Sequence, residues 1–217
     1  VYTGATYGWD IFAQIGANDT SVLTQTNTVS GITNKTFVAP VLGAALASTL
    51  QATTTIGVGN ATPSASGAGI SFPATQSAST DANTLDDYEE GTWTPSISFG
   101  GASVGQTNDL AAAGYTKIGN VVTVTGIVRL TAKGSSTGTA AVAGLPFTCK
   151  NGNANYSVPS FRTSAVTYTG VITGYVTVNA TTAVLRQVTA AGTQSDMTDT
   201  NFANTSEVNM TTTYFTA

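Results

Sequence analysis

Val121–Leu130 reads VVTVTGIVRL, and its alternation decides the fold class. Apolar and polar side chains alternate along it. Val122, Val124, Val128 and Leu130 would lie on one face of a strand, and Thr123, Thr125 and Arg129 on the other. This two-residue period, carried by β-branched residues, predicts a strand with one face in a core. Gly126 in mid-strand indicates a β-bulge or the close approach of another backbone.

Shorter segments of the same kind lie before and after this one, and polar turns separate them. We expect strands at Ser96–Phe99, Ala140–Ala143, Ser164–Thr169, Val171–Val178, Ala183–Val188 and Val208–Phe215. Many short strands at this spacing, with no helical pattern, are typical of an antiparallel β-sandwich. The sequence therefore predicts an all-β fold whose C-terminal domain, residues 96–217, is a jelly-roll-like sandwich tip.

Residues 1–82 are built differently, from Thr, Ala, Gly and Ser with few large side chains. Thr53–Val58 and Ile70–Phe72 are strand candidates, and Leu42–Leu50 fits either a short helix or extended chain. Burial of apolar surface contributes about 25 cal/mol per Å², whereas ordering costs about 1–2 kcal/mol per residue. We therefore expect an extended, intertwined homotrimeric stem, in which copies cover one another; a disordered linker is the alternative.

The stretch Asn83–Pro95 (NTLDDYEEGTWTP) separates these two compositions. Four of the eleven acidic residues fall within five positions, at Asp86, Asp87, Glu89 and Glu90. We interpret residues 83–95 as an acidic hinge whose carboxylates lie in solvent. A cation site and a catalytic carboxylate pair are the alternatives, and the second needs two carboxyls held across a cleft.

The composition excludes several classes of function. With no His, the chain lacks Ser-His-Asp catalysis and His-based zinc motifs. The net charge of −4 and seven scattered basic residues argue against nucleic-acid binding, and no apolar run approaches the roughly 18 residues of a membrane helix. Cys149 is alone and is expected to be buried. We predict no catalytic residue, no metal site, no cofactor and no membrane insertion.

The best candidate ligand site is the polar loop Lys150–Ser157 (KNGNANYS). Amides bond to sugar hydroxyls and an aromatic ring stacks on the apolar face of a sugar. The candidate glycan-binding residues are Asn151, Asn153, Asn155 and Tyr156; an ordinary solvated loop is the alternative. Asp196 and Asp199 lie in another polar loop and lack the spacing of a calcium loop.

Four segments resemble, in this order, the C-terminal region of bacteriophage tail fibre and tailspike-like proteins: Asn83–Pro95, Tyr115–Val124 (YTKIGNVVTV), Lys133–Phe147 (KGSSTGTAAVAGLPF) and Asp199–Phe215 (DTNFANTSEVNMTTTYF). Gly31–Leu42 (GITNKTFVAPVL) also resembles the Thr/Pro-punctuated repeats of fibre shafts in this family, so the resemblance covers roughly residues 30 to 217. The resemblance implies a virion protein that trimerises, contacts other phage tail proteins and uses its tip on a host cell-surface glycan. Receptors vary among such tips, so no binding residue carries over.

The same resemblance leaves rival functions open. One is a purely structural virion component, such as a short fibre, baseplate or head-decoration protein. Another is the carbohydrate-binding module of a depolymerising tailspike. Some relatives carry an enzymatic β-helix, for which this chain lacks both the length and the carboxylate layout. Val1 in place of Met leads us to expect a truncated or processed chain.

Overall fold

A computed structural model of the chain describes residues 55–59, 61–63, 66–76, 79–81 and 83–216. All of them belong to one unit, Gln51–Ala217. The expected features before residue 55, including the helix or extended chain at Leu42–Leu50, lie outside the described residues.

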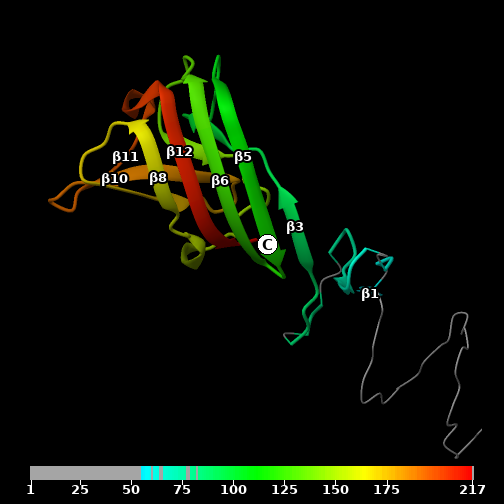
Figure 1. Cartoon of the computed structure of the whole chain (residues 1–217). Coiled ribbons are helices and arrows are strands. Elements are labelled where there is room, and N and C mark those ends of the chain that lie inside the picture. The colour runs from blue at the N-terminus through cyan, green and yellow to red at the C-terminus, as the bar shows by residue number, and fades with distance from the viewer. Residues whose placement is uncertain (1–54, 60, 64–65, 77–78, 82, 217) are drawn as a thin grey trace, which may run out of the picture. The chain divides into compact units, whose positions relative to one another are not determined.

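Two five-stranded sheets build most of this unit. The first sheet is antiparallel throughout and has the order β3-β5-β6-β12-β8 (Figure 1). Its strands are β3 (Tyr88–Thr92), β5 (Thr107–Ile118), β6 (Val121–Ala132), β12 (Phe202–Phe215) and β8 (Ser160–Val166). β5 and β6 form a long hairpin, and Gly119 turns it with a φ of 56° that favours glycine.

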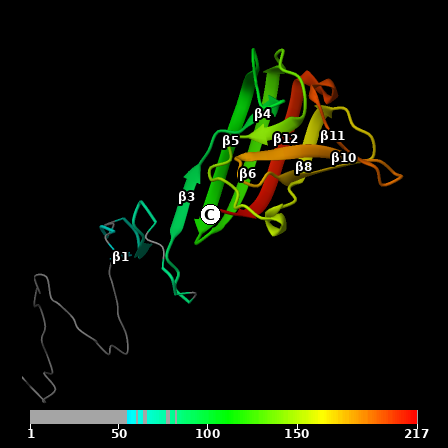
Figure 2. The ribbon, with the colours of Figure 1, turned by 180° about the vertical axis from the view of Figure 1, so that it is seen from behind.

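The second sheet centres on β10 (Thr182–Val188). β9 (Val171–Val176) pairs along one edge of β10. β7 (Ala140–Ala143) and β11 (Gln194–Asp196) pair with the beginning and the end of β10, and β4 (Ser96–Phe99) continues the sheet beyond β7. Figure 2 shows β10 running across the strands of the first sheet, so the two sheets pack crosswise.

The core lies between the sheets and follows the alternation of β6. Val122, Val124, Val128 and Leu130 are at most 1% exposed, as expected. Phe99 from β4 meets Phe202 from β12 edge to face, with ring centres 5.1 Å apart. Burial of a Val, Leu or Phe side chain in this core contributes about 1.5–3 kcal/mol to the free energy of unfolding. Cys149 is also buried, as predicted.

Gly126 marks a close approach and not a bulge. It pairs in continuous register with Ala113 on one side and Met210 on the other. A Cβ atom at this position would lie 2.9 Å from Cζ2 of Trp93 and 3.1 Å from Cβ of Ala113. The neighbour that needs the space is therefore a buried indole ring, and not another backbone.

The described residues before the sandwich contain two short strands, β1 (Thr55–Gly57) and β2 (Gly69–Ser71). They pair in parallel, with Ile56 opposite Ile70. Both strands fall where the sequence predicts them. The intertwined trimeric stem stays a prediction, as does the division into residues 1–82, 83–95 and 96–217.

The all-β, antiparallel class is confirmed, but three details differ from expectation. The hairpins β5–β6 and β9–β10 each stay within one sheet, which is not the double Greek key of a jelly roll. β3 lies inside the expected hinge and forms an edge strand of the first sheet. Asp87 is 3% exposed, so the acidic stretch is not solvated throughout; its carboxylate is buried because it has a lysine partner.

Candidate ligand-binding site

The loop Lys150–Ser157 connects β7 to β8 and is tied to the sandwich at both ends. The Lys150 amide donates to the Phe215 carbonyl at 2.7 Å, and the Ser157 carbonyl accepts from the Val176 amide at 2.8 Å. A short 3₁₀ turn, η2 (Asn153–Asn155), shapes its middle. The loop is therefore held in place by hydrogen bonds to two strands, β12 and β9.

The four predicted residues share this loop but play different parts. The Asn155 Nδ2 donates to the Asn151 carbonyl at 2.7 Å, and the Asn155 carbonyl lies 3.4 Å from the thiol of Cys149. Asn155 is half-buried and holds the loop together, whereas Asn151 and Asn153 are exposed. Tyr156 is 47% exposed.

Tyr156 stands beside residues that the sequence analysis did not single out. Its ring meets Tyr175 of β9 edge to face, with centres 5.5 Å apart. The guanidinium of Arg186, on β10, lies 5.8 Å from the centre of the Tyr175 ring. These residues are distant in sequence, so only strand pairing brings them together.

The acidic stretch does not form a site. Asp87 forms a buried ion pair with Lys117, and Glu89 accepts a hydrogen bond from the Tyr115 hydroxyl. That bond, together with burial, raises the pKa of Tyr115 to about 12. Asp86 accepts from the Ser79 amide at 2.8 Å, and Glu90 accepts from the Tyr88 hydroxyl. Each carboxylate has its own partner, so the four do not converge on one ligand.

The second pair of acids is also divided. Asp196 accepts from Arg186 at 2.7 Å. Asp199 accepts from the Gly138 amide at 2.9 Å and lies 3.4 Å from Nζ of Lys133. Among the described residues, no group of three or more His, Cys, Asp or Glu side chains is arranged to hold a metal ion.

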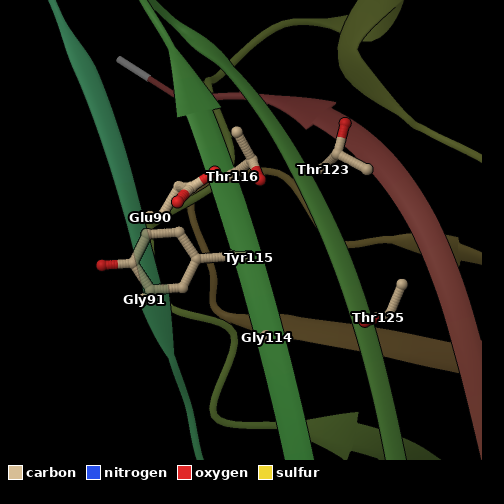
Figure 3. A pocket seen from close by; sticks show the side chains of 7 residues that line it. All are labelled: Glu90, Gly91, Gly114, Tyr115, Thr116, Thr123 and Thr125. Atoms are coloured by element: carbon tan, nitrogen blue, oxygen red, sulfur yellow. The ribbon is translucent and has the colours of Figure 1, made fainter. Parts of the chain in front are cut away.

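A shallow hollow of about 360 Å³ lies on the outer face of the first sheet (Figure 3). It opens where Gly114 has no side chain, and hydroxyls and one carboxylate surround it. The lining residues are Glu90, Gly91, Gly114, Tyr115, Thr116, Thr123 and Thr125. One of these threonines has a partner outside the hollow, since the hydroxyl of Thr123 lies 3.0 Å from that of Thr213 in β12.

No protein-family model and no curated protein matches the sequence. Among solved structures the chain is similar to the Dettilon tailspike protein (gp208), with a TM-score of 0.46 and 12% identity over 69% of this chain. The chain spans 27% of the length of that protein. At this TM-score the likeness does not establish a shared fold.

The described part of the chain contains no helix that is long and apolar enough to cross a membrane. The loop Lys150–Ser157, with its exposed Tyr156, is the candidate ligand-binding site. Its geometry suits contact with a ligand from solvent. The Tyr156 ring and the side chains of Asn151 and Asn153 are exposed, while backbone hydrogen bonds fix both ends of the loop.

Proposed function

We propose that this chain is a non-enzymatic, homotrimeric tail fibre protein of a bacteriophage, part of the virion, whose sandwich tip binds a host cell-surface glycan. Residues 1–82 form the stem and contact other tail proteins, residues 83–95 join stem to tip, and residues 96–217 form the tip. The ordered motifs from Asn83–Pro95 to Asp199–Phe215, which resemble such proteins, support the assignment to a phage tail.

The observation that carries glycan binding is Tyr156 in a loop whose backbone is already ordered. Folding leaves the Tyr156 ring 47% exposed, so a bound ligand can bury the apolar surface that remains in contact with solvent. Because Asn155 and the flanking amides fix the loop, binding there costs little further ordering. The side chains of Asn151 and Asn153 then supply donors and acceptors for sugar hydroxyls.

The homotrimer is supported by an uncovered apolar row at one end of the first sheet. Tyr88, Ile118, Val121 and Phe215 pair in sequence across β3, β5, β6 and β12, so they share one face. The residue preceding or following each of them is buried, which places the row on the outer face. Tyr88, Ile118 and Phe215 are 42%, 49% and 44% exposed.

The parallel pair β1–β2 supports the same proposal. Parallel strand pairs are slightly less stable than antiparallel ones, and parallel sheets normally have both faces covered by other elements. Ile56 and Ile70 are nevertheless 37% and 57% exposed in the single chain. Contact with further copies covers these side chains and the apolar row together.

Competition with phage adsorption tests the proposed function. Full-length protein is added to host cells before the phage, and free phage are counted over time. Dose-dependent protection of the cells is expected from an adhesin. If the protein neither binds the cells nor slows adsorption, the purely structural virion component replaces the adhesin.

A further inference from the structure

The outer face of the second sheet carries a strip of planar side chains that the sequence analysis did not assign to any site. Buried Gly174 and Leu185 pair with each other and point inward, so the alternate positions on β9 and β10 face outward. The outward positions include Tyr175 and Arg186, and Asp196 of β11 pairs directly with Arg186. We call Tyr156, Tyr175, Arg186, Gln194 and Asp196 the outer strip.

Contacts within the outer strip fix the arginine in one plane. Its Nε donates to Oδ1 of Asp196 at 2.7 Å, and its Nη1 donates to Oε1 of Gln194 at 3.0 Å. Its guanidinium carbon lies 5.8 Å from the centre of the Tyr175 ring, which in turn supports Tyr156. The side chains of Arg186 and Asp196 remain 32% and 39% exposed.

Stability alone is a weak reason for this arrangement. An ion pair at this exposure contributes about 0–1 kcal/mol, and holding several long side chains in place costs conformational entropy. The contacts do hold the groups in place: the donors of the Arg186 guanidinium and the Asp196 carboxylate are fixed next to the rings of Tyr175 and Tyr156. Preordered groups bind a ligand without losing further freedom.

The chemistry of the outer strip matches that of a pyranose ring. One face of a pyranose exposes C–H groups that pack on an aromatic ring, and its edge carries adjacent hydroxyls. A guanidinium and a carboxylate bind such hydroxyls with charge-assisted hydrogen bonds. The charges of Arg186 and Asp196 cancel, so the strip offers no net attraction to an acidic sugar.

We infer that the outer strip is a saccharide subsite that extends the Lys150–Ser157 loop and takes a neutral pyranose. The inference rests on the proposed glycan binding of that loop and adds Tyr175, Arg186, Gln194 and Asp196 to the site. Tyr156 joins the two parts, since it belongs to the loop and contacts Tyr175.

The test is a glycan array probed with the full-length chain and with strip variants. The wild-type protein should bind neutral saccharides, and its affinity should be unchanged by added salt because no net charge is involved. Arg186→Ala and Asp196→Asn should each weaken this binding by about tenfold or more, the effect of losing one well-placed polar contact. Arg186→Lys keeps the charge but loses the fork, so it should also weaken binding.

Arg162→Ala is the matched control. Arg162 lies on the first sheet, is paired with Glu207 at 2.9 Å, and its loss should leave saccharide binding unchanged. Thermal melts show which variants still fold. If Arg186→Ala does not fold, Arg186→Lys tests the inference in its place.

Two results overturn the inference while the proposed function stands. One is binding that is lost in Tyr156→Ala but is kept in folded variants of Arg186 and Asp196. The other is binding of acidic saccharides alone, with an affinity that falls as salt rises. If the array shows no saccharide binding, the subsite is wrong, and the adsorption experiment decides the proposed function separately.

Discussion

Lys117 shows how far a single residue can depend on partners distant in sequence. It is 4% exposed and is paired with Asp87 of the acidic stretch. Its Nζ also lies 3.3 Å from Oε1 of Gln76 and 5.6 Å from the centre of the Phe147 ring. A buried charge of this kind is tolerated only because it is paired and hydrogen-bonded.

Asp87→Asn should therefore destabilise the chain by about 3–5 kcal/mol, because it leaves the buried ammonium of Lys117 without a counter-charge. Urea denaturation followed by tryptophan fluorescence measures this. Asp109→Asn is the matched control: Asp109 pairs with Arg129 at 2.9 Å, but both side chains are about half exposed, and its loss should cost less than about 1 kcal/mol. Equal costs for the two variants would contradict the role given to Lys117.

Asp199 gives a prediction about pH. The Gly138 amide, with help from Lys133, lowers the pKa of Asp199 below its usual value of 3.8. The ionised Asp199 carboxylate therefore stabilises the folded state fully above its unperturbed pKa. This stabilisation is lost as the pH falls through the lower pKa of the folded state. Asp199→Asn should lower stability at neutral pH and make the loss of stability in acid shallower. Melting temperatures across the acid range test this, and an unchanged acid slope would count against it.

At the level of elements, the sequence predicts those strands whose two faces differ most. β6 alternates large apolar residues with threonines and is predicted almost to its ends. β5 (TNDLAAAGYTKI) was not predicted, because its central Ala and Gly side chains are too small to show which face is buried. β3 is not predicted, since acidic residues disfavour strands. It forms because it pairs with β5 and because Glu89 accepts a hydrogen bond from Tyr115, while Asp87, just before the strand, is paired with Lys117.

Gly126 tests how closely β6 packs on Trp93. Gly126→Ala should cost about 1–3 kcal/mol, because the added methyl meets a ring that cannot move without disturbing the core. Gly114→Ala is a fitting control: it lies in the neighbouring strand, and its Cβ would be 3.6 Å from the nearest atom, the Gly91 carbonyl oxygen. Denaturation midpoints should fall for Gly126→Ala and stay near wild type for Gly114→Ala; the reverse order would refute the packing account.

At the level of the whole molecule, the candidate site was only partly visible in the sequence. The Lys150–Ser157 loop could be predicted because its polar residues are adjacent in the chain. Tyr175 and Arg186 could not, since they come from separate strands and meet Tyr156 only after the sheets form. The charge pattern of Asn83–Pro95 favours a solvated hinge, and it does not reveal that Asp87 has a buried partner in Lys117.

The apolar row makes a prediction about assembly. Mass photometry of the full-length chain should give three times the monomer mass of 21.9 kDa. Ile118→Lys places a charge in the row and should shift the population toward monomers. Val104→Lys, at a more exposed apolar position near the opposite end of β5 (65% against 49% for Ile118), should not. A folded wild-type monomer at micromolar concentration would refute the trimer.

The central claim is that the Lys150–Ser157 loop attaches the protein to its host, and the most direct test is the binding of labelled full-length protein to host cells. We compare wild type with Tyr156→Ala and with Tyr168→Ala, a second exposed tyrosine outside the loop. Wild type and Tyr168→Ala should bind equally, and Tyr156→Ala should bind at least about tenfold more weakly, as expected for an aromatic anchor. Equal binding by all three folded proteins would contradict the claim.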